Sequence, residues 1–272
     1  MSIRAWIATL ALLLPLTATA GGSQAVYEME ARGEIEIGPG GAVHDYRLNS
    51  DLTPEIAEIV GNKVRTWEFE PVLIDGKPVI AKTMMRLQLS AVPTDDDRYA
   101  LQVKNVWFGE PQRSGRITPP DYPMDAVYKG LGAKVVLVLR LDADGKVVDV
   151  LPEQTSLTSE GSERDVNRFR TLFERASIKA AKRWKFDMTE QIGGRPIGSM
   201  VRIPVTYTLS DGPRPQTDGK WNGFVPGPIR PIPWVTSETV ASQAERDRLT
   251  DGDVQSLGSR FKLKEEIVGK TL

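Results

Sequence analysis

The side chains that most often perform catalysis or bind metals are scarce in this sequence of 272 residues, which contains one histidine and no cysteine. Serine-histidine-aspartate catalysis would have to use His44, yet no Gly-x-Ser-x-Gly turn is present to hold a serine nucleophile. Zinc sites made of histidine and cysteine need more of these residues than the chain has. We therefore expect no catalytic residue and no metal site, and we interpret His44 as a surface or hydrogen-bonded residue of a strand.

A second pattern, in which Asp142 and Asp144 are followed by Glu153, has the spacing of a calcium-binding loop. In such a loop the fifth position supplies an oxygen ligand and the sixth is glycine, but here these positions are Lys146 and Val147. The Asp-Gly pair that begins at Asp144 is instead a strong signal for a two-residue hairpin turn. We therefore predict a turn between two strands and no calcium site.

Nucleotide and nucleic-acid binding are not indicated either. Gly130 and Gly132 lack the third glycine and the preceding strand of a dinucleotide-binding turn, and no phosphate-binding Gly-x4-Gly-Lys-Ser/Thr motif occurs. The formal net charge of -1 gives no basic excess for binding a polyanion. We expect no cofactor, no small-molecule substrate and no nucleic-acid partner.

Two aromatic pairs, Trp67 with Phe69 and Trp184 with Phe186, have the spacing of side chains on one face of a strand. Such pairs could stack a ligand, or they could close the end of a helix against a sheet. Each pair follows a segment with helical periodicity and precedes one with strand periodicity. We therefore favour packing in the core over ligand binding.

Residues 1–20 have the pattern of a secretory signal peptide, with Arg4, an apolar stretch over residues 5–16 and a run of small residues that ends at Ala20. The apolar stretch is shorter than the roughly 20 residues that a membrane-spanning helix needs. We expect cleavage after Ala20 and export of the remainder. Since the chain has no cysteine, its stability must come from buried apolar area and not from disulfides.

The near-neutral total charge conceals two regions of opposite sign. Residues 28–70 contain ten acids and four bases, whereas residues 163–186 contain eight bases and three acids. These regions are either solvated faces or surfaces that dock on each other, and the sequence leaves both interpretations open.

The first half of the sequence predicts two strands, a helix and a closing strand. A Gly-Pro-Gly-Gly turn separates β-prone residues 27–37 from residues 42–48. Thr53 and Pro54 then begin a helix that runs to about Thr66. Apolar and polar residues alternate over residues 85–91, as they do in a half-buried strand.

The second half repeats this order. Residues 134–141 and 146–151 flank the Asp-Gly turn, and residues 163–183 carry an apolar stripe of helical period. Residues 199–209 alternate as a closing strand. We interpret the repetition as an internal duplication of a β-β-α-β unit.

The connecting segments are less regular. Residues 99–108 alternate well enough for a strand, and a boundary is expected near residues 93–98, where a proline precedes three aspartates. Beyond Leu209 the sequence is rich in proline and glycine and then polar, which predicts an ill-ordered or loosely docked extension.

Residues 117–209 resemble the C-terminal domain of the TonB family. The resemblance rests on a Tyr-Pro-x-x-Ala opening, a glycine before the first strand, an Asp-Gly hairpin and a Trp-x-Phe pair, in that order. The residues that carry it are Pro120, Tyr122, Pro123, Ala126, Gly132, Gly145, Trp184 and Phe186. Residues 32–91 resemble the same domain more loosely, because the Tyr-Pro opening is missing.

This resemblance implies an α+β fold of two TonB C-terminal-like β-β-α-β modules, each a small antiparallel sheet packed on a helix. The expected division is a signal peptide over residues 1–20, a divergent N-terminal TonB-like module over 24–93 and the clearer TonB C-terminal-like domain over 98–210. A Pro/Gly-rich and polar extension over residues 211–272 completes the chain.

In the TonB family the last strand of this domain pairs with an extended segment of an outer-membrane transporter. The resemblance therefore implies that residues 199–208 form a partner-binding edge strand, to which a partner adds by main-chain hydrogen bonds. Pro204 has no N–H group and belongs on an edge or at a bulge, where it could equally serve to prevent aggregation. The proposed edge residues are Ser199, Val201, Arg202, Ile203, Pro204, Val205, Thr206, Tyr207 and Thr208.

The sequence departs from a TonB energy transducer in having no membrane helix that is clearly retained and no long proline-rich spacer. We expect a periplasmic, non-catalytic protein that binds a protein partner, with a TonB-dependent outer-membrane transporter as the candidate. Two alternatives stay open. One is a TonB transducer anchored in the inner membrane, and the other is a structural or assembly protein whose modules pair with each other or self-associate.

Overall fold

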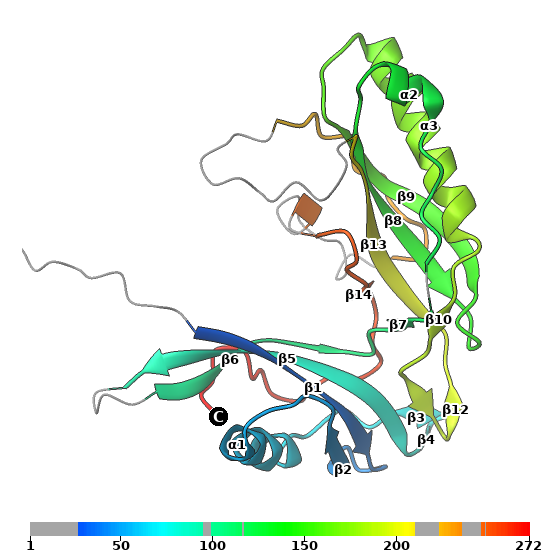
Figure 1. Ribbon diagram of the computed structural model, residues 1–272. Coiled ribbons are helices and arrows are strands. Elements are labelled where there is room, and N and C mark those ends of the chain that lie inside the picture. Colours follow the sequence, from blue (N-terminus) through cyan, green and yellow to red (C-terminus); the bar gives the residue numbers. More distant parts are fainter. Residues whose placement is uncertain (1–26, 95–98, 116, 210–222, 236–245, 248) are drawn as a thin grey trace, which may run out of the picture.

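The computed structural model describes residues 27–94, 99–115, 117–209, 223–235, 246, 247 and 249–272. The predicted signal peptide, residues 1–20, lies outside these residues. The chain forms two lobes, each with an antiparallel sheet and a helix against one of its faces (Figure 1). The lobes meet along short strands, and the C-terminal segment runs between them. The fold is therefore mixed, with mostly antiparallel strands and few helices.

The N-terminal lobe is built around a six-stranded sheet. Its main strands are antiparallel neighbours in the order β2-β1-β5-β6, and β5 pairs with β1 over its length. The elements that the chain contributes here in sequence order are β1 (Tyr27–Ile37), β2 (Val43–Leu48), α1 (Pro54–Arg65), β3 (Leu73–Ile74), β4 (Lys77–Pro78), β5 (Ala81–Pro93) and β6 (Tyr99–Phe108).

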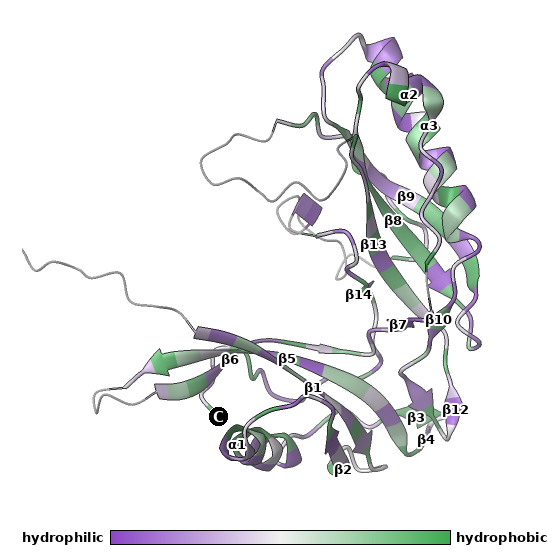
Figure 2. Ribbon diagram, in the orientation of Figure 1, coloured by the Kyte–Doolittle hydropathy of each residue, from purple (hydrophilic) through white to green (hydrophobic). Residues whose placement is uncertain are grey.

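Strict alternation of side chains gives this sheet one apolar and one charged face. Hydrophobic and hydrophilic residues follow each other along β1 (Figure 2). Ile35 and Ile37 point into the core beneath α1 together with Val60 and Val64 of the helix. Because successive residues of a strand point to opposite faces, the neighbouring Glu34 and Glu36 lie on the other face. The N-terminal lobe thus has one buried and one solvated face.

The chain does not pass from the N-terminal sheet to the C-terminal sheet at the boundary predicted near residues 93–98. β6 pairs with β5 from Pro93 opposite Tyr99 to Met85 opposite Phe108, so it belongs to the N-terminal sheet. An alternating pattern shows that a segment is a strand but does not show which sheet it joins. The change from one lobe to the other therefore comes after Phe108.

The C-terminal lobe has a four-stranded sheet in the order β14-β13-β8-β9. Helix α3 packs against β8 and β9 on one face of this sheet. The elements that follow β6 in the sequence are β7 (Gln112–Arg113), α2 (Met124–Tyr128), β8 (Ala133–Leu141), β9 (Val147–Leu157), α3 (Glu163–Ala181), β10 (Phe186–Asp187), β11 (Gln191–Ile192), β12 (Arg195–Pro196), β13 (Ser199–Tyr207) and β14 (Gln255–Ser256). Of these, β11 and β12 complete the six-stranded sheet of the N-terminal lobe.

Helix α3 begins where Ser162 accepts a hydrogen bond from the backbone N–H of Asp165, which satisfies one of the first donors of the helix. Its apolar stripe places Phe169 and Phe173 in the core. Trp184 and Phe186 are 6% and 1% exposed, so the packing interpretation of this aromatic pair is confirmed.

The two lobes share one local plan. The strand order β2-β1-β5 in the first corresponds to β9-β8-β13 in the second, and a helix follows the first hairpin in both. The N–H of Phe69 donates to the carbonyl of Gly41, and that of Phe186 donates to the carbonyl of Gly145. A Cβ on Gly145 would lie 1.7 Å from the Phe186 oxygen, so only glycine allows this approach.

The C-terminal extension differs from the expectation of loose docking. In its described parts, Phe261 and Ile267 are buried in the core of the N-terminal lobe, and Ile232 and Leu257 are buried against the C-terminal sheet. These apolar residues are isolated within polar sequence and have no helical or strand period. Composition therefore gave no signal for their burial. Among the described helices, none is both long and apolar enough to cross a membrane.

Truncation of Trp184 tests the assignment of the aromatic pair to the core. We expect Trp184→Ala to lower the free energy of unfolding by about 3–5 kcal/mol, because a large buried aromatic is lost. The indole also donates from Nε1 to the carbonyl of Thr118 at 3.0 Å. Denaturant melts measure the change. Tyr128→Ala, at an aromatic that is 81% exposed, is the control and is expected to change the free energy by less than about 0.5 kcal/mol.

Candidate functional site

The predicted edge strand is β13, and its two sides are paired very differently. On one side it pairs with β8 over all nine residues from Ser199 to Tyr207. On the other side, within the described part of the chain, strand pairing covers only Val201 opposite Ser256 and Arg202 opposite Gln255. β13 is therefore an edge strand whose outer side carries a two-residue partner from the C-terminal extension.

The direction of the main-chain groups of β13 follows from two hydrogen bonds. The carbonyl of Met200 accepts from Leu257, and the N–H of Thr206 donates to an oxygen of the Asp251 carboxylate at 3.2 Å. In an antiparallel strand the N–H and C=O of one residue point to the same side and alternate with the next residue. The even-numbered residues from 200 to 206 therefore point their main-chain groups outward, away from β8.

Pro204 belongs to this outward set. Its missing N–H would have pointed away from β8, so it costs no hydrogen bond in the ladder that holds β13 in the sheet. Its side chain is buried, whereas Thr206 and Thr208 are exposed. The accessible part of the predicted edge is therefore its C-terminal end.

The residues of the TonB-like motif hold the sheet and the helices together and do not lie on this edge. Tyr122 donates from its hydroxyl to the carbonyl of Leu131 at 2.9 Å and packs its ring edge-on against Phe173 and Tyr207. Burial raises the pKa of Tyr207 to about 12, and its hydroxyl bonds to the Ser177 hydroxyl. This aromatic group fixes the end of β13 beneath α3.

The remaining motif residues shape turns and close contacts. Pro120 is the first residue of the Pro-Asp-Tyr-Pro stretch that begins the motif. Pro123 immediately precedes α2, and the carbonyl of Pro123 accepts a hydrogen bond from the N–H of the fully buried Ala126. A Cβ on Gly132 would lie 2.6 Å from the carbonyl oxygen of Tyr207. Glycine at position 132 therefore lets the chain enter β8 beside the end of β13.

A buried ion cluster lies behind the edge, on the sheet face opposite α3. The Glu153 carboxylate accepts from Arg202 of β13 at 2.7 and 2.9 Å. It also accepts from Arg246 of the C-terminal extension at 3.0 and 3.4 Å. The side chains of Glu153, Arg202 and Arg246 are 3%, 1% and 1% exposed. The cluster therefore joins β9, β13 and the extension in one desolvated site.

A β-bulge places Glu153 in this cluster. Pro152 lies opposite Leu137 and Gln154 lies opposite Val136, so Glu153 is the extra residue between them. Burial alone would raise the pKa of the Glu153 carboxyl, but the hydrogen bonds and charges of the two arginines outweigh it and lower the pKa. Glu153 is thus held ionised between two guanidinium groups.

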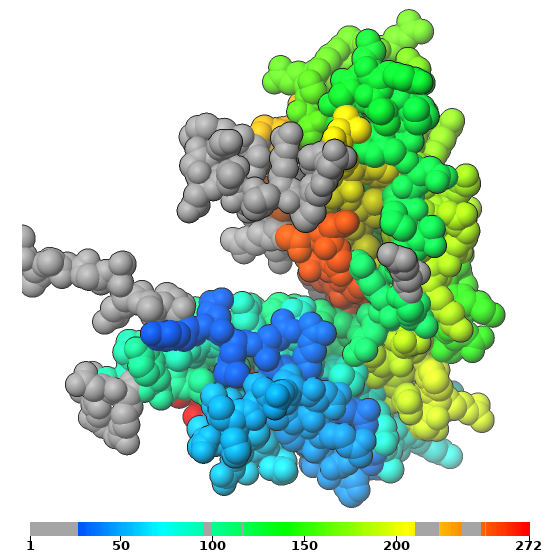
Figure 3. Space-filling model, in the orientation of Figure 1, coloured from blue at the N-terminus to red at the C-terminus, as the bar shows by residue number. Residues whose placement is uncertain are grey.

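A cleft separates the C-terminal segment from the charged face of the N-terminal sheet. Its cavity has a volume of about 570 Å³ and is bordered by Arg86, Trp107 and Arg113 on one side and by residues 252–255 on the other. Figure 3 shows the segment around β14 in orange within the angle between the lobes. The cleft therefore lies directly beside the short strand that occupies the edge of β13.

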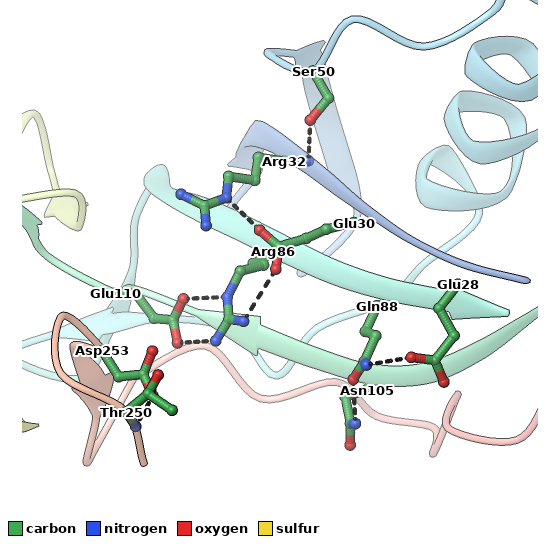
Figure 4. A network of polar contacts seen from close by, with 10 residues as sticks. All are labelled: Glu28, Glu30, Arg32, Ser50, Arg86, Gln88, Asn105, Glu110, Thr250 and Asp253. Carbon is green, nitrogen blue, oxygen red and sulfur yellow. Dashed lines mark hydrogen bonds and ion pairs between the residues drawn. The ribbon is translucent and has the colours of Figure 1, made fainter. Parts of the chain in front are cut away.

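The charges on the sheet side of the cleft largely pair with each other (Figure 4). Arg86 binds Glu110 through two hydrogen bonds of 2.6 Å, contacts Glu30 at 3.3 Å and lies 3.9 Å from the ring centre of Trp107. Asp253, on the other side, accepts from the N–H and hydroxyl of Thr250. Such a balanced network gives the cleft no strong field of one sign.

The lobes are joined by main-chain pairing at the base of the cleft. Gln191 and Ile192 of β11 pair with Lys82 and Ala81 of β5. Just before them, the Glu190 carboxyl is 2% exposed and accepts from the Ser259 hydroxyl at 2.5 Å. Burial raises the pKa of Glu190. The carboxyl thus lies where the hairpin of one lobe, the sheet of the other and the C-terminal extension meet.

The two oppositely charged regions do not meet in the structure. No ion pair between described residues joins residues 28–70 to residues 163–186. Lys179 of α3 contacts Asp121 at 3.4 Å, and both side chains are exposed. The structure thus favours solvated faces over charge docking.

The sequence singled out the β13 edge but gave no signal for the buried cluster. The spacing of Glu153 from Asp142 indicates only a calcium loop, and the partners of its carboxylate lie 49 and 93 residues away. Within the described residues, no three histidine, aspartate or glutamate side chains lie close enough to hold a metal ion. His44 lies in β2, and its side chain is exposed.

Comparison with curated proteins matches the chain to Protein TonB from two strains of Xanthomonas campestris pv. campestris. Each is 32% identical over 97 residues, which are 36% of this chain and 38% of the relative. The chain thus spans under two fifths of the length of these relatives. No family model matches it, and no solved structure does. The similarity supports a TonB C-terminal-like domain within this chain.

Because the Glu153 carboxylate lies between two buried arginines, removing its charge is predicted to destabilise the folded protein strongly. We expect Glu153→Gln to lower the free energy of unfolding by about 3–5 kcal/mol at pH 7, because two buried arginines lose their counter-charge. Because the folded-state pKa of Glu153 is lowered, this contribution is present above the ordinary pKa of 4.5 and is lost as the pH falls below it. Denaturant melts over a range of pH measure both effects.

Asp149→Asn is the matched control, since Asp149 lies on the same strand and pairs with Arg140 at an exposed site. A change of at most about 1 kcal/mol is expected there. Equal losses for the two variants would contradict the assignment of a buried cluster.

Glu190 predicts the opposite dependence on pH. Its folded-state pKa is raised, so the unfolded chain loses this proton first as the pH rises above 4.5, and the folded state becomes less stable. Glu190→Gln keeps an oxygen for the Ser259 hydroxyl and removes the buried charge. We expect this variant to melt at a higher temperature than the wild type at pH 7, with a smaller difference at pH 4. Glu160→Gln, at an exposed site, should show neither change.

Proposed function

We propose that this chain is a TonB-like, non-catalytic protein of the cell envelope that binds an extended segment of a protein partner by strand addition to β13. The partner in this proposal is a TonB-dependent outer-membrane transporter, and the location is the periplasm. The observation that carries the proposal is the asymmetric pairing of β13, which has nine paired residues on its inner side and two on its outer side.

Strand addition suits the physical properties of this edge. The outward main-chain groups near Pro204 and Thr206 extend beyond the two residues that β14 covers. Main-chain hydrogen bonds would give affinity with little dependence on sequence, and alternate side chains of the partner would give selectivity. Because Pro204 has no N–H, a partner can accept main-chain hydrogen bonds only from residues on either side of it.

The shared plan of the two lobes supports an internal duplication, in which the N-terminal lobe is a divergent copy of the TonB-like domain. β5 takes the place in the first sheet that β13 takes in the second. The outer side of β5 is already paired with β6 from Met85 to Pro93 and with β11 at Ala81 and Lys82. The equivalent edge is therefore closed in the N-terminal lobe, and binding by strand addition is assigned to β13.

A second candidate function is structural assembly. The closure of β5 by β11 favours it, because here a hairpin of one lobe extends the sheet of the other within one chain. In this alternative the lobes support each other, and β13 contacts a second copy of the chain or no partner at all. The recovered partner distinguishes it from the proposed function.

A third possibility is a TonB energy transducer that stays anchored in the inner membrane. It depends on residues 1–20, which lie outside the described residues. Intact-mass analysis of the native protein decides between the two locations. A mass that includes residues 1–20 supports the anchored form, and a mass that begins at Gly21 supports a released periplasmic protein.

Site-specific photocrosslinking tests the proposed edge. We place a photoreactive amino acid at Thr206 or Thr208, both of which are exposed, and irradiate the protein in envelope preparations. Adducts with outer-membrane transporters are expected, because the partner strand would run beside these residues. A photoreactive residue at Tyr128, which is exposed on α2 and is not part of β13, is the control and is expected to give no such adduct.

Mass spectrometry identifies the adducts. Recovery only of this chain would favour assembly, and equal recovery of transporters from Tyr128 and Thr206 would show that the contact is not specific to β13.

A further inference from the structure

The outer side of β13 is occupied by the chain itself. Residues 249–257, which we call the strap, run along this side and include β14. Three main-chain contacts connect the strap to β13: two ladder positions and the bond from Leu257 to the carbonyl of Met200 at 2.7 Å. The strap therefore lies in the position that an added partner strand would take.

The strap imitates a strand over only part of the edge. At Thr206 the outward N–H is bonded to the side chain of Asp251 and not to a main-chain carbonyl. A carboxylate thus takes the place of a ladder acceptor where the strap diverges from β13. Such a contact satisfies the donor of Thr206 without a regular strand, so a longer strand with a continuous ladder could replace it.

Several polar atoms next to the strap lack partners among the described residues. The hydroxyls of Ser256 and Ser199 and the indole Nε1 of Trp234 are buried without a hydrogen bond. Ser256 lies in β14, Ser199 begins β13, and Trp234 packs in the small cluster with Leu257. Buried polar groups without partners weaken a contact. Within the strap, the Ser256 hydroxyl therefore gains no hydrogen bond from the docked position.

Charges hold the strap in place in spite of this. Gln255 of the strap accepts from Arg202 at 2.9 Å, and Arg246, just before the strap, binds the Glu153 carboxylate. Leu257 is buried against Val138 on the sheet face opposite α3. Arg246 therefore anchors the chain beside the edge, whereas the contacts of Gln255 and Leu257 belong to the strap itself and are broken when it leaves β13. A strap with a strong anchor and a short, incompletely satisfied strand can leave the edge while it stays attached nearby.

The cleft provides space for this movement. Leu249, Gly252 and residues 253–255 of the strap border the cavity of about 570 Å³ on the side away from β13. The strap therefore has open space beside it into which part of it can move.

We propose that the strap is an internal competitor of the partner strand, so that the edge of β13 is closed when the strap is docked and opens when it leaves. The proposal rests on the proposed function, because it assigns a regulator to the same edge. A partner must then supply more main-chain contacts than the strap does, and any change that weakens the Arg246 anchor raises the population of the open form.

Amide hydrogen exchange along β13 tests the strap without a partner. In Arg246→Ala, the outward amides of Arg202 and Thr206 are expected to exchange roughly tenfold to a hundredfold faster, because hydrogen bonds to a buried charge are lost from the anchor. The inward amides of Val201, Ile203 and Val205, which face β8, are expected to keep their rates.

The inward amides are an internal control for unfolding, since global destabilisation would accelerate both sets together. Arg230→Ala is the matched control variant, because Arg230 binds Glu174 and contacts β9 but not β13. If Arg246→Ala fails to fold, Asp251→Ala is used instead, with faster exchange expected at Thr206 alone. Equal acceleration of both sets of amides, or none at either, would overturn the proposal.

A reversible disulfide tests competition with a partner. Val201 and Ser256 are direct, non-hydrogen-bonded neighbours, a geometry in which Cα atoms approach to about 4.5 Å and a disulfide can form. The chain has no cysteine, so the variant Val201→Cys with Ser256→Cys contains only this pair. Photocrosslinking from Thr208 to outer-membrane transporters is expected to be lost when the pair is oxidised and restored when it is reduced.

The arms of this experiment separate the two proposals. Equal crosslinking in both redox states would overturn the strap as a competitor and leave strand binding to β13 intact. If no transporter crosslinks in either state, the proposed function fails, and the exchange rates of the outward and inward amides still decide whether the strap opens.

Discussion

The structure depends on the main-chain pairing of one strand. β13 is held to β8 over nine residues, and this ladder fixes Val201, Ile203 and Val205 in the core beneath α3. An antiparallel strand must point alternate main-chain groups to its other side, where they need partners or water. Pro204, the short strand β14 and the arginines that surround Glu153 all lie on or beside that outer row.

The two lobes satisfy the same requirement in different ways. In the N-terminal sheet, the outer side of β5 is paired with β11 at Ala81 and Lys82 and with β6 from Met85 to Pro93, so most of the strand is interior. In the C-terminal sheet, the corresponding side carries a two-residue strand, a carboxylate and a proline. The N-terminal sheet is thus closed by β6 and by β11, whereas the edge of the C-terminal sheet is covered by a segment that makes few strand contacts. This difference is the reason why the proposed partner binding is placed on the second lobe and not on the first.

Local patterns predicted most elements of the fold because their causes are local. The Gly-Pro-Gly-Gly turn, the Asp-Gly turn and the serine before α3 specify hairpins and a helix start from neighbouring residues. The assignment of β6 failed, since alternation does not identify the sheet that a strand joins. Glu153 could not be recognised as a buried charge, because Arg202 and Arg246 reach it only through the folded sheet and a bulge. The docking of the extension was missed for the same reason, since its isolated apolar residues have no period.

The proposed function requires that an extended partner segment can lie along the outer side of β13. Isotope-filtered NMR of the labelled protein with a synthetic peptide copying the N-terminal periplasmic segment of a TonB-dependent transporter measures this directly. Ile203 and Val205 point no main-chain groups outward, so their Hα atoms are expected to lie close to Hα atoms of an added antiparallel strand. Peptide contacts to these two Hα atoms are the predicted result. Contacts confined to α3 or to the charged face of the N-terminal sheet, with the strap still bound to β13, would contradict the account.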